Sequence, residues 1–242
     1  MTRRSARRET GLFLAEGAQA VREALAAGVV ETVFATASAL ERFPVDGTAV
    51  SQISEKAAAS LSETVHPQGV VAVCRRVDLP LSLTGARLAV GLVEPSDPGN
   101  AGTILRTADA AGASAVVFAG DGVDPYNGKV VRASAGSLFH VGLALSALDA
   151  LLDEAGAAGL QVLATTGGGA VDLDALIDDG SLTRPTLWLF GNEAHGLPPD
   201  VLRAAQVTVR IPIYGRAESL NLAAAAAVCL YASARAQRET LR

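Results

Sequence analysis

Residues 188–231, WLFGNEAHGLPPDVLRAAQVTVRIPIYGRAESLNLAAAAAVCLY, decide how this chain folds. Two apolar runs of strand length each end in a loop rich in glycine and proline, and the second loop leads into a helix made mostly of alanine. Asn192, Glu193, Ser219 and Asn221 stand where these runs end. In an open α/β sheet, ligands bind beyond the carboxyl ends of the strands. The stretch therefore predicts a pocket between two neighbouring loops.

Upstream of this stretch, apolar runs of strand length alternate with helical spacing. Strands are expected at 87–93, 113–120, 160–165 and 186–190, and helices near 97–112 and 145–157. This alternation predicts an α/β fold with a mostly parallel sheet and helices on both faces. The front of the chain predicts a smaller α/β unit, with strands at 29–35, 49–53 and 69–75 and helices at 17–27 and 55–61. We expect domains at 1–78 and 87–242, joined by a linker at 79–86.

Composition limits the class of protein. The chain has 242 residues, of which 50% are hydrophobic, so it is expected to be globular rather than disordered. No apolar run has the length of a membrane span, and charged residues interrupt any signal-peptide core behind the basic N-terminus. Cys74 and Cys229 lie far apart in apolar runs, which is typical of reduced, buried thiols. We therefore expect a cytoplasmic protein with no membrane partner.

Charge permits a nucleic-acid partner only if the binding face is local. The formal net charge is −5, whereas phosphate binding needs clustered lysine and arginine. Two clusters exist, and each is open to interpretation as a phosphate site or as an ordinary solvated face. The first comprises Arg3, Arg4, Arg7 and Arg8, and the second comprises Lys129, Arg132 and the neighbouring Ser134.

Polar residues near the expected helix starts are candidates for a site. Asn100 is expected to cap the helix that follows it, and spacing favours the solvent side for Arg106, two turns further on. Ser219 is expected to cap the alanine helix and Asn221 to lie in its first turn, although capping alone would also explain Ser219. The three histidines are isolated in sequence, without metal-ligand spacing or an acidic partner, so no metal is expected.

Three segments together resemble a known family. NAGTILRTADAAGA (100–113), LFGNEAHGLP (189–198) and IPIYGRAESLNLAAAAAV (211–228) resemble, in order and spacing, the motifs of the SpoU (TrmH-like) branch of the SPOUT class of RNA methyltransferases. VVRASAGSLFHV (130–141) also resembles that branch. In front, RRETGLFLAEG (7–17) and LSETVHPQGVVAV (61–73) are similar to a small substrate-binding domain of ribosomal-protein-like α/β fold.

The resemblance implies a deep trefoil knot, a homodimer, S-adenosylmethionine as cofactor and RNA, in the first place ribosomal RNA, as partner. The implied activity is methylation of a ribose 2′-hydroxyl. A tRNA 2′-O-methyltransferase of the same branch and a non-catalytic dimeric RNA-binding homologue are the alternatives. The arginines of the N-terminal cluster, with Lys129, Arg132, Ser134 and Arg216, are then expected to form the RNA face.

When the family's motifs are aligned with this sequence, the positions that the resemblance implies are catalytic correspond to Asn100, Arg106, Glu193, Ser219 and Asn221. Because a guanidinium stays protonated, Arg106 is expected to grip the phosphate beside the target ribose while phosphate or Ser219 accepts the proton. Arg106 is expected to come from either subunit. The cofactor is expected against loops that comprise Thr165, Thr166, Gly167, Phe190, Gly191, Asn192, Glu193, Gly196, Ile211, Pro212, Ile213, Ser219 and Leu220.

Overall fold

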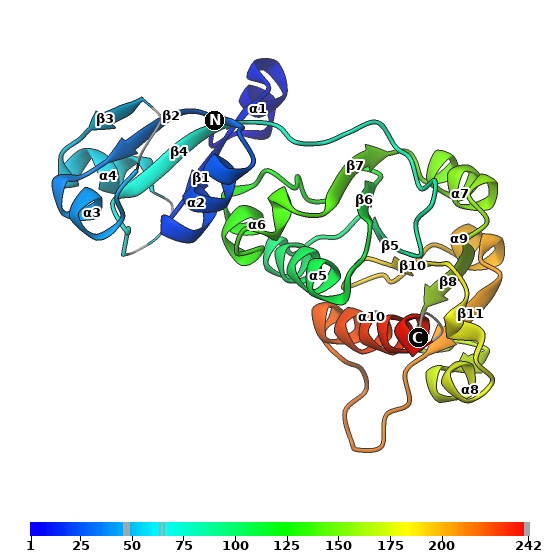
Figure 1. Cartoon of the computed structure of the whole chain (residues 1–242). Helices are drawn as coiled ribbons and strands as arrows, with labels where there is room; N and C mark the ends of the chain where they lie inside the picture. The colour runs from blue at the N-terminus through cyan, green and yellow to red at the C-terminus, as the bar shows by residue number, and fades with distance from the viewer. Residues whose placement is uncertain (46–48, 63, 65, 240–242) are drawn as a thin grey trace.

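The computed structural model describes residues 1–45, 49–62, 64 and 66–239, which form two β-sheets flanked by helices (Figure 1). Glu63 and Val65, which belong to the front motif at 61–73, lie outside the described residues. The N-terminal part, coloured blue to cyan, lies beside the end of the large sheet that carries α6 (Gly128–Ala133). Helix α6 contacts β1 (Leu12–Glu16) there.

The small sheet has four strands in the order β1-β4-β2-β3. Strand β4 (Val70–Arg75) is antiparallel to both β1 and β2 (Val30–Ala35), and β3 (Val50–Gln52) pairs parallel to β2. Because β4 is central, all of its residues except the last are buried. The helices are α1 (Arg4–Thr10), α2 (Ala18–Ala26), α3 (Ala37–Arg42) and α4 (Glu55–Leu61). The sequence did not predict β1, α1 or α3, whose short runs carry little periodicity.

The large sheet confirms the predicted fold class. Its seven strands are all paired in parallel in the described structure, in the order β7-β6-β5-β10-β8-β11-β9. The strands are β5 (Leu88–Val93), β6 (Ala115–Ala119), β7 (Gly142–Ser146), β8 (Gln161–Thr165), β9 (Val171–Asp172), β10 (Thr186–Phe190) and β11 (Val207–Arg210). The central strands β5, β6 and β10 are buried along their whole length, which explains their continuous apolar sequences.

Helices cover both faces of this sheet. Alternate side chains of the strands pack on one face against α5 (Pro98–Ala111), α6, α8 (Leu173–Asp178) and α10 (Leu222–Glu239). The other face packs against α7 (Leu148–Ala157) and α9 (Pro199–Ala204). In Figure 1, α5 and α10 lie side by side, and they contact each other extensively. The trefoil knot stays a prediction.

The two predicted helix caps are wrong by a few residues. Helix α5 spans nearly the expected residues, but its cap is Asp97 rather than Asn100: the Asp97 side chain accepts the Asn100 N–H at 2.8 Å, with Pro98 at the first helical position. Proline there fixes the backbone and needs no donor, so the cap moves to the residue before it. Helix α10 begins later, because Oδ1 of Asn221 accepts the N–H groups of Ala223 and Ala224 at 2.9 and 3.3 Å. Asn221, not Ser219, is therefore the cap.

The expected linker is irregular but packed. Residues 79–86 contain no helix or strand, yet Leu83 and Ala86 are buried against the face that carries α7 and α9. The Leu79 N–H donates to the Leu143 carbonyl at 2.8 Å, and the Leu83 N–H donates to Glu154 at 2.7 Å. The segment is therefore fixed on the large domain and is not a free tether.

An apolar contact joins the two domains. Phe13 of β1 is fully buried, and its ring lies 4.7 Å from that of Tyr126 and 6.1 Å from that of Phe139, measured between centroids. Both partners belong to the large domain, on either side of α6. Rings at these separations attract beyond simple burial, so the contact favours one fixed arrangement of the domains.

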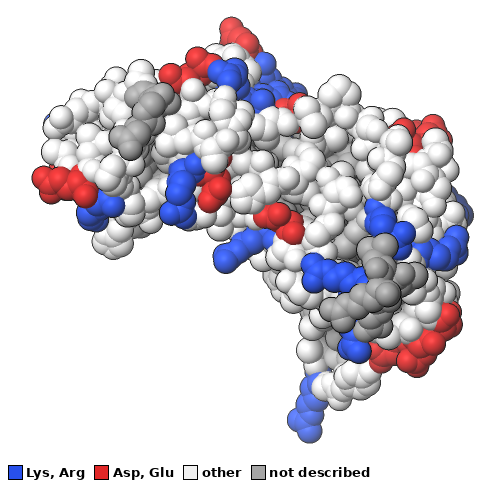
Figure 2. Space-filling model, viewed as in Figure 1, with Lys and Arg blue, Asp and Glu red and all other residues white. Residues whose placement is uncertain are grey.

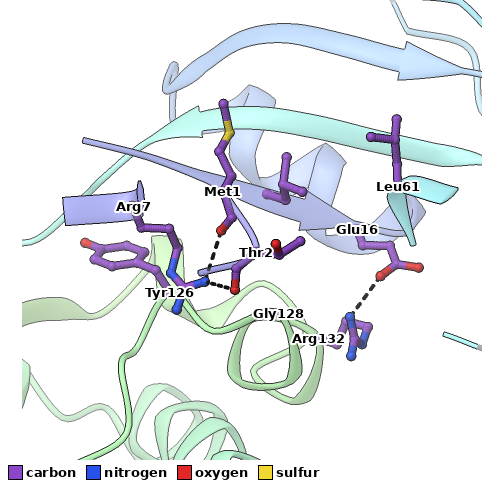
Figure 3. Close-up of a pocket in the computed structure, with 9 residues that line it drawn as sticks. Met1, Thr2, Arg7, Glu16, Leu61, Tyr126, Gly128 and Arg132 are labelled. Atoms are coloured by element: carbon purple, nitrogen blue, oxygen red, sulfur yellow. Dashed lines mark hydrogen bonds and ion pairs between the residues drawn. The ribbon is translucent and has the colours of Figure 1, made fainter. Parts of the chain in front are cut away.

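Charge pairs flank this apolar contact. Arg7 of α1, only 4% exposed, forms an ion pair with Asp124 at 2.7 Å, and Glu16 of β1 pairs with Arg132 of α6 at 2.8 Å. Figure 3 shows the Arg7 guanidinium also donating to the carbonyl groups of Met1 and Thr2. Separating the domains would leave these charges without their partners, which is unfavourable. The ion pairs therefore stabilise one relative position of the two domains.

Within the described part of the chain, no helix is long and apolar enough to cross a membrane. The same residues include no group of three or more His, Cys, Asp and Glu side chains that could hold a metal ion. Both cysteines are buried and free, and burial raises the pKa of each thiol to about 12. A thiol with such a pKa is a poor nucleophile at neutral pH, which fits a packing role.

Candidate functional site

Glu193 joins the loop after β10 to the start of α5. Its carboxylate accepts the backbone N–H and the hydroxyl of Ser96 at 2.8 and 2.6 Å, and the Asp97 N–H at 3.2 Å. It also accepts the side-chain amide N–H of Asn100 at 3.0 Å. One carboxylate thereby fixes the turn that leads into α5.

Asn100 extends this contact to a third segment. Its Oδ1 accepts a hydrogen bond from Nδ2 of Asn221 at 3.0 Å, while its own Nδ2 donates to Glu193. The loop after β10, the start of α5 and the start of α10 therefore meet through a row of three polar side chains. The positions are 93 and 121 residues apart from Asn100 in sequence, so only the fold brings them together.

The electrostatics of this row favour a charged Glu193. Burial alone would raise the pKa of Glu193, but hydrogen bonds from Ser96 and Asn100 outweigh it and hold that pKa below its usual value. The pKa of Asp97 is also lowered, first by the Asn100 N–H and then by the Lys129 ammonium group 3.1 Å away. Both carboxylates are accordingly ionised at neutral pH.

The loop after β10 is a tight turn. Asn192 exchanges two backbone hydrogen bonds with Gly196, at 3.0 and 2.8 Å, and its side chain donates to the Glu94 carbonyl at 2.9 Å. A Cβ at Gly191 would stand 2.3 Å from the carbonyl carbon of Gly196, so only glycine fits there. This close approach holds together the two ends of the turn that carries Glu193.

A cavity of about 170 Å³ lies at the carboxyl ends of β8 and β11. Seven of its lining residues are among those predicted for the cofactor: Thr165, Thr166, Gly167, Ile211, Ile213, Ser219 and Leu220. The remaining lining residues, missed from the sequence, are Val209, Glu218 and Ala225. Glu218 directly precedes Ser219, so its position in the motif was a signal that could have found it. Six predicted residues do not line this cavity: Phe190, Gly191, Asn192, Glu193, Gly196 and Pro212.

Arg106 lies apart from the row of polar side chains. It belongs to the exposed stripe of α5, together with Thr103 and Ala110, as its spacing predicted. Among the described residues it makes no hydrogen bond or ion pair. A single chain therefore leaves this guanidinium available to an external partner.

The predicted RNA-binding cluster needs correction. Arg7 is buried against Asp124, and Ser134 is fully buried with its hydroxyl donating to the Val131 carbonyl, so neither is open to a phosphate. Arg132 pairs with Glu16 across the domain contact. Arg7 is buried because α1 docks on the large domain, and Arg132 is paired because β1 contacts α6, neither of which sequence alone could show. Arg3, Arg8 and Lys129 remain exposed, and Arg4, partly buried, donates to the Gly122 carbonyl at 3.1 Å.

On the side shown in Figure 2, basic and acidic side chains are interspersed over the N-terminal half, whereas several basic side chains gather at the lower right. His140 is one example of a cross-domain contact, since it bonds Asp109 at 2.9 Å and Glu23 at 3.2 Å. His140 has no acidic partner nearby in sequence, as expected, but the fold brings it two carboxylates from distant segments. The charged groups therefore serve partly to join the domains.

This parallel α/β fold and its motif segments match a family of RNA methyltransferases. Residues 87–231 match the SpoU rRNA Methylase family, and residues 1–72 match the MRM3-like substrate binding domain. The chain belongs to the SpoU rRNA Methylase family.

Individual relatives agree over most of the chain. It is 35% identical over 229 residues to the 23S rRNA (guanosine(2553)-2′-O)-methyltransferase RlmP of Bacillus subtilis, covering 93% of this chain and 89% of that protein. The AdoMet-bound rRNA methyltransferase of Sinorhizobium meliloti is 34% identical with a TM-score of 0.82, covering 97% and 91% of the two chains. The SpoU methyltransferase AviRb of Streptomyces viridochromogenes, in complex with AdoMet, is 31% identical with a TM-score of 0.81, covering 98% and 94%.

Proposed function

We propose that this protein transfers a methyl group from S-adenosylmethionine to a ribose 2′-hydroxyl of ribosomal RNA. The observation that carries the proposal is the contact of Glu193, Asn100 and Asn221, which brings the three motif segments of the family together near the cavity at β8 and β11. Relatives that align over nearly the whole chain are named for ribosomal RNA, which favours that substrate over tRNA. A non-catalytic role is disfavoured because the chain retains the motif residues Arg106, Ser219 and Asn221.

The lining of the cavity fits S-adenosylmethionine. Val209, Ile211 and Leu220 offer apolar walls for an adenine ring, and hydroxyl groups stand nearby on Thr166 and Ser219. A Cβ at Gly167 would meet nothing within 4 Å, so the glycine leaves space for a ligand beside the backbone. When bound, the cofactor supplies a methyl group on a positively charged sulfur. The Glu218 carboxylate at the same cavity would favour that charge.

We assign the polar row a positioning role and Arg106 a direct one. Asn100 and Glu193 fix the start of α5, and Asn221 fixes the start of α10, so that the acceptor ribose would meet the methyl group in one orientation. Arg106 would grip the phosphate beside that ribose, because a guanidinium binds phosphate well and stays protonated. The proton would go to the phosphate, or to solvent with the Ser219 hydroxyl as a relay that releases its own proton as it takes up the new one.

The proposal includes a homodimer. Helix α10 exposes Val228 and Tyr231, which are 43% and 53% exposed, on one side of the helix. The loop before it exposes Ile213, Tyr214 and Leu220. An apolar surface of this kind is typical of a protein–protein contact. A second chain docked there could bring its Arg106 to this chain's site. We also propose that 1–78 acts as the RNA-binding unit, 79–86 as the connection and 87–242 as the catalytic unit.

The experiment is methyl transfer in vitro. Purified protein, labelled S-adenosylmethionine and unmethylated ribosomal RNA transcripts should give labelled RNA, and reverse-transcription stops should map a single ribose. Arg106→Ala should lower the rate by about 100-fold or more, since a misplaced acceptor loses alignment. Its affinity for S-adenosylmethionine, measured by calorimetry, should stay nearly unchanged.

Arg203→Gln, at an exposed arginine on α9, is the matched control and should keep full activity. Methylation of tRNA transcripts but not of ribosomal RNA would replace the proposed substrate. An equal loss of cofactor affinity in Arg106→Ala would contradict the role assigned to that residue.

A further inference from the structure

The N-terminal domain holds a second cavity, which is larger than the one at β8 and β11. Its volume is about 530 Å³, within the range of roughly 300–1,000 Å³ usual for small-molecule sites. It lies between α2 and the end of α3, and the first residues of β4 close it. Figure 1 places α2 and α3 at the lower edge of this domain. None of the proposed catalytic residues lines it.

The floor of this cavity is apolar and its rim is basic. Val21, Leu25, Val45 and Val70 supply aliphatic walls. Arg22, whose side chain is 70% exposed, and Arg42 stand at the edge, whereas no Asp or Glu is among the described lining residues. Glu23, which does not line the cavity, lies 3.7 Å from the Arg22 guanidinium and offsets part of its charge. An apolar slot with two arginines at its edge complements a flat ring attached to a negative charge.

An aromatic side chain is available at the same edge. Phe43 is 38% exposed, although a phenylalanine in a loop would gain from burial. The Arg42 guanidinium lies 5.8 Å from the centroid of the Phe43 ring, and its Nε donates to the Ser38 carbonyl at 3.1 Å. Phe43 and Arg42 thus form an ordered pair of flat groups, of the kind on which bases stack.

Polar edges for hydrogen bonding are also present. The Gln68 Oε1 accepts the Ala18 N–H at 2.8 Å, which fixes the amide and leaves its Nε2 donors without a partner among the described residues. Gln19 and Gln68 also line an adjoining cavity of about 230 Å³, which continues to Arg132 at the domain contact. An RNA strand bound in the first cavity could therefore extend along the second cavity towards the catalytic domain.

We propose that the cavity between α2 and α3 binds one unpaired nucleobase of the RNA substrate, stacked on Phe43 and Arg42, with Arg22 against the adjoining phosphate. The proposal rests on the RNA methyltransferase function proposed above and assigns its recognition site. An unpaired base fits better than a duplex, because single-stranded bases expose the flat faces and edges that such a slot contacts.

The first measurement is direct binding of RNA. Fluorescence anisotropy with a short single-stranded RNA of mixed sequence should show Phe43→Ala weakened by about 5- to 150-fold, the effect usual for one base stacked on an aromatic ring. Arg22→Gln, at a site too exposed to affect folding, should weaken binding and reduce its salt dependence. The same RNA as a duplex should bind wild type more weakly, and Arg203→Gln should bind like wild type.

The second measurement separates this site from the catalytic one. With ribosomal RNA transcripts, Phe43→Ala should raise the KM for RNA and leave kcat and the affinity for S-adenosylmethionine unchanged. Replacing single nucleotides by abasic ones should reveal one position at which the KM for RNA rises as much as it does in Phe43→Ala. Combining that RNA with Phe43→Ala should raise the KM no further.

Unchanged RNA affinity and KM in both Phe43→Ala and Arg22→Gln would overturn the proposal. A change of sedimentation in these variants without a change of RNA affinity would show that a second chain occupies the cavity, which also overturns it. If wild type methylates no RNA, the proposed activity fails, whereas the anisotropy measurement still decides whether the cavity binds a base.

Discussion

Asn100 holds two neighbours with opposite hydrogen-bonding needs. Its Nδ2 donates to the Glu193 carboxylate and its Oδ1 accepts from Asn221, each at 3.0 Å. An amide is the side chain that both donates and accepts in this geometry. The sequence identified Asn100 through a family motif and a capping role, whereas the structure gives the cap to Asp97 and leaves Asn100 free to bridge.

The substitution Asn100→Asp tests this bridge. The new carboxylate still accepts from Asn221 but faces Glu193 as a like charge, which raises the pKa of Glu193 from its lowered value. As pH falls, one of the two carboxylates is protonated and can donate again. The methylation rate of Asn100→Asp relative to wild type should therefore be about 10-fold or more reduced at pH 8 and should recover as pH falls towards 5.

Two controls accompany that profile. Asn100→Ala, which can neither donate nor accept, should be impaired at every pH, and far-ultraviolet circular dichroism should show both variants folded. A rate ratio for Asn100→Asp that does not vary with pH would show that the bridge to Glu193 does not position the site.

At the scale of elements, His140 links helices from both domains. It follows the short helix at Ser137–Phe139 and bonds Asp109 on α5 and Glu23 on α2. The hydrogen bond with Asp109 is the largest cause of its raised pKa, burial opposes it, and Glu23 adds to it. Neither carboxylate is near His140 in sequence, so the contact depends on how α2 docks beside α5.

This contact predicts a pH-dependent stability. Because the folded-state pKa of His140 is raised, its contribution is fully present below the unfolded value of about 6.5 and is lost as pH rises through the folded value. The side chain is 44% exposed, so the contribution is below about 1 kcal/mol. His140→Gln should lower Tm by a few degrees at pH 6 and have little effect at pH 9, measured by calorimetry.

His66→Gln, at an exposed histidine of the N-terminal domain, is the control and should change Tm equally little at both pH values. If His140→Gln lowers Tm by the same amount at pH 6 and pH 9, the contact does not depend on protonation.

At the scale of the whole molecule, the proposed dimer bears on the catalytic site. The polar row and the cavity lie within one chain, but Arg106 stands on an exposed stripe of α5 without a partner among the described residues. Either RNA alone brings the phosphate to Arg106, or a second chain places its Arg106 at the site. The two arrangements predict different behaviour of mixed dimers.

Mixing two inactive variants distinguishes the two arrangements of Arg106. Arg106→Ala and Asn221→Ala should each be inactive, and unfolding and refolding them together should restore about a quarter of wild-type activity if the site is shared, since half the dimers are mixed and each has one complete site. Wild type unfolded and refolded together with Arg106→Ala is the control, and its activity shows how much is recovered by the refolding procedure itself. No recovery despite mixed dimers detected by mass spectrometry would place Arg106 in its own chain's site.

The fold class and the motif residues could be predicted from the sequence, because buried parallel strands are apolar throughout and the turns between them need glycine, proline and polar caps at set positions. Which of those residues meet follows from the packing of the folded chain alone. Asn221, rather than Ser219, stands at the start of α10, and Arg7 and Ser134 are buried away from solvent. Such pairings depend on how helices dock across more than a hundred residues of chain, and local periodicity carries no record of that docking.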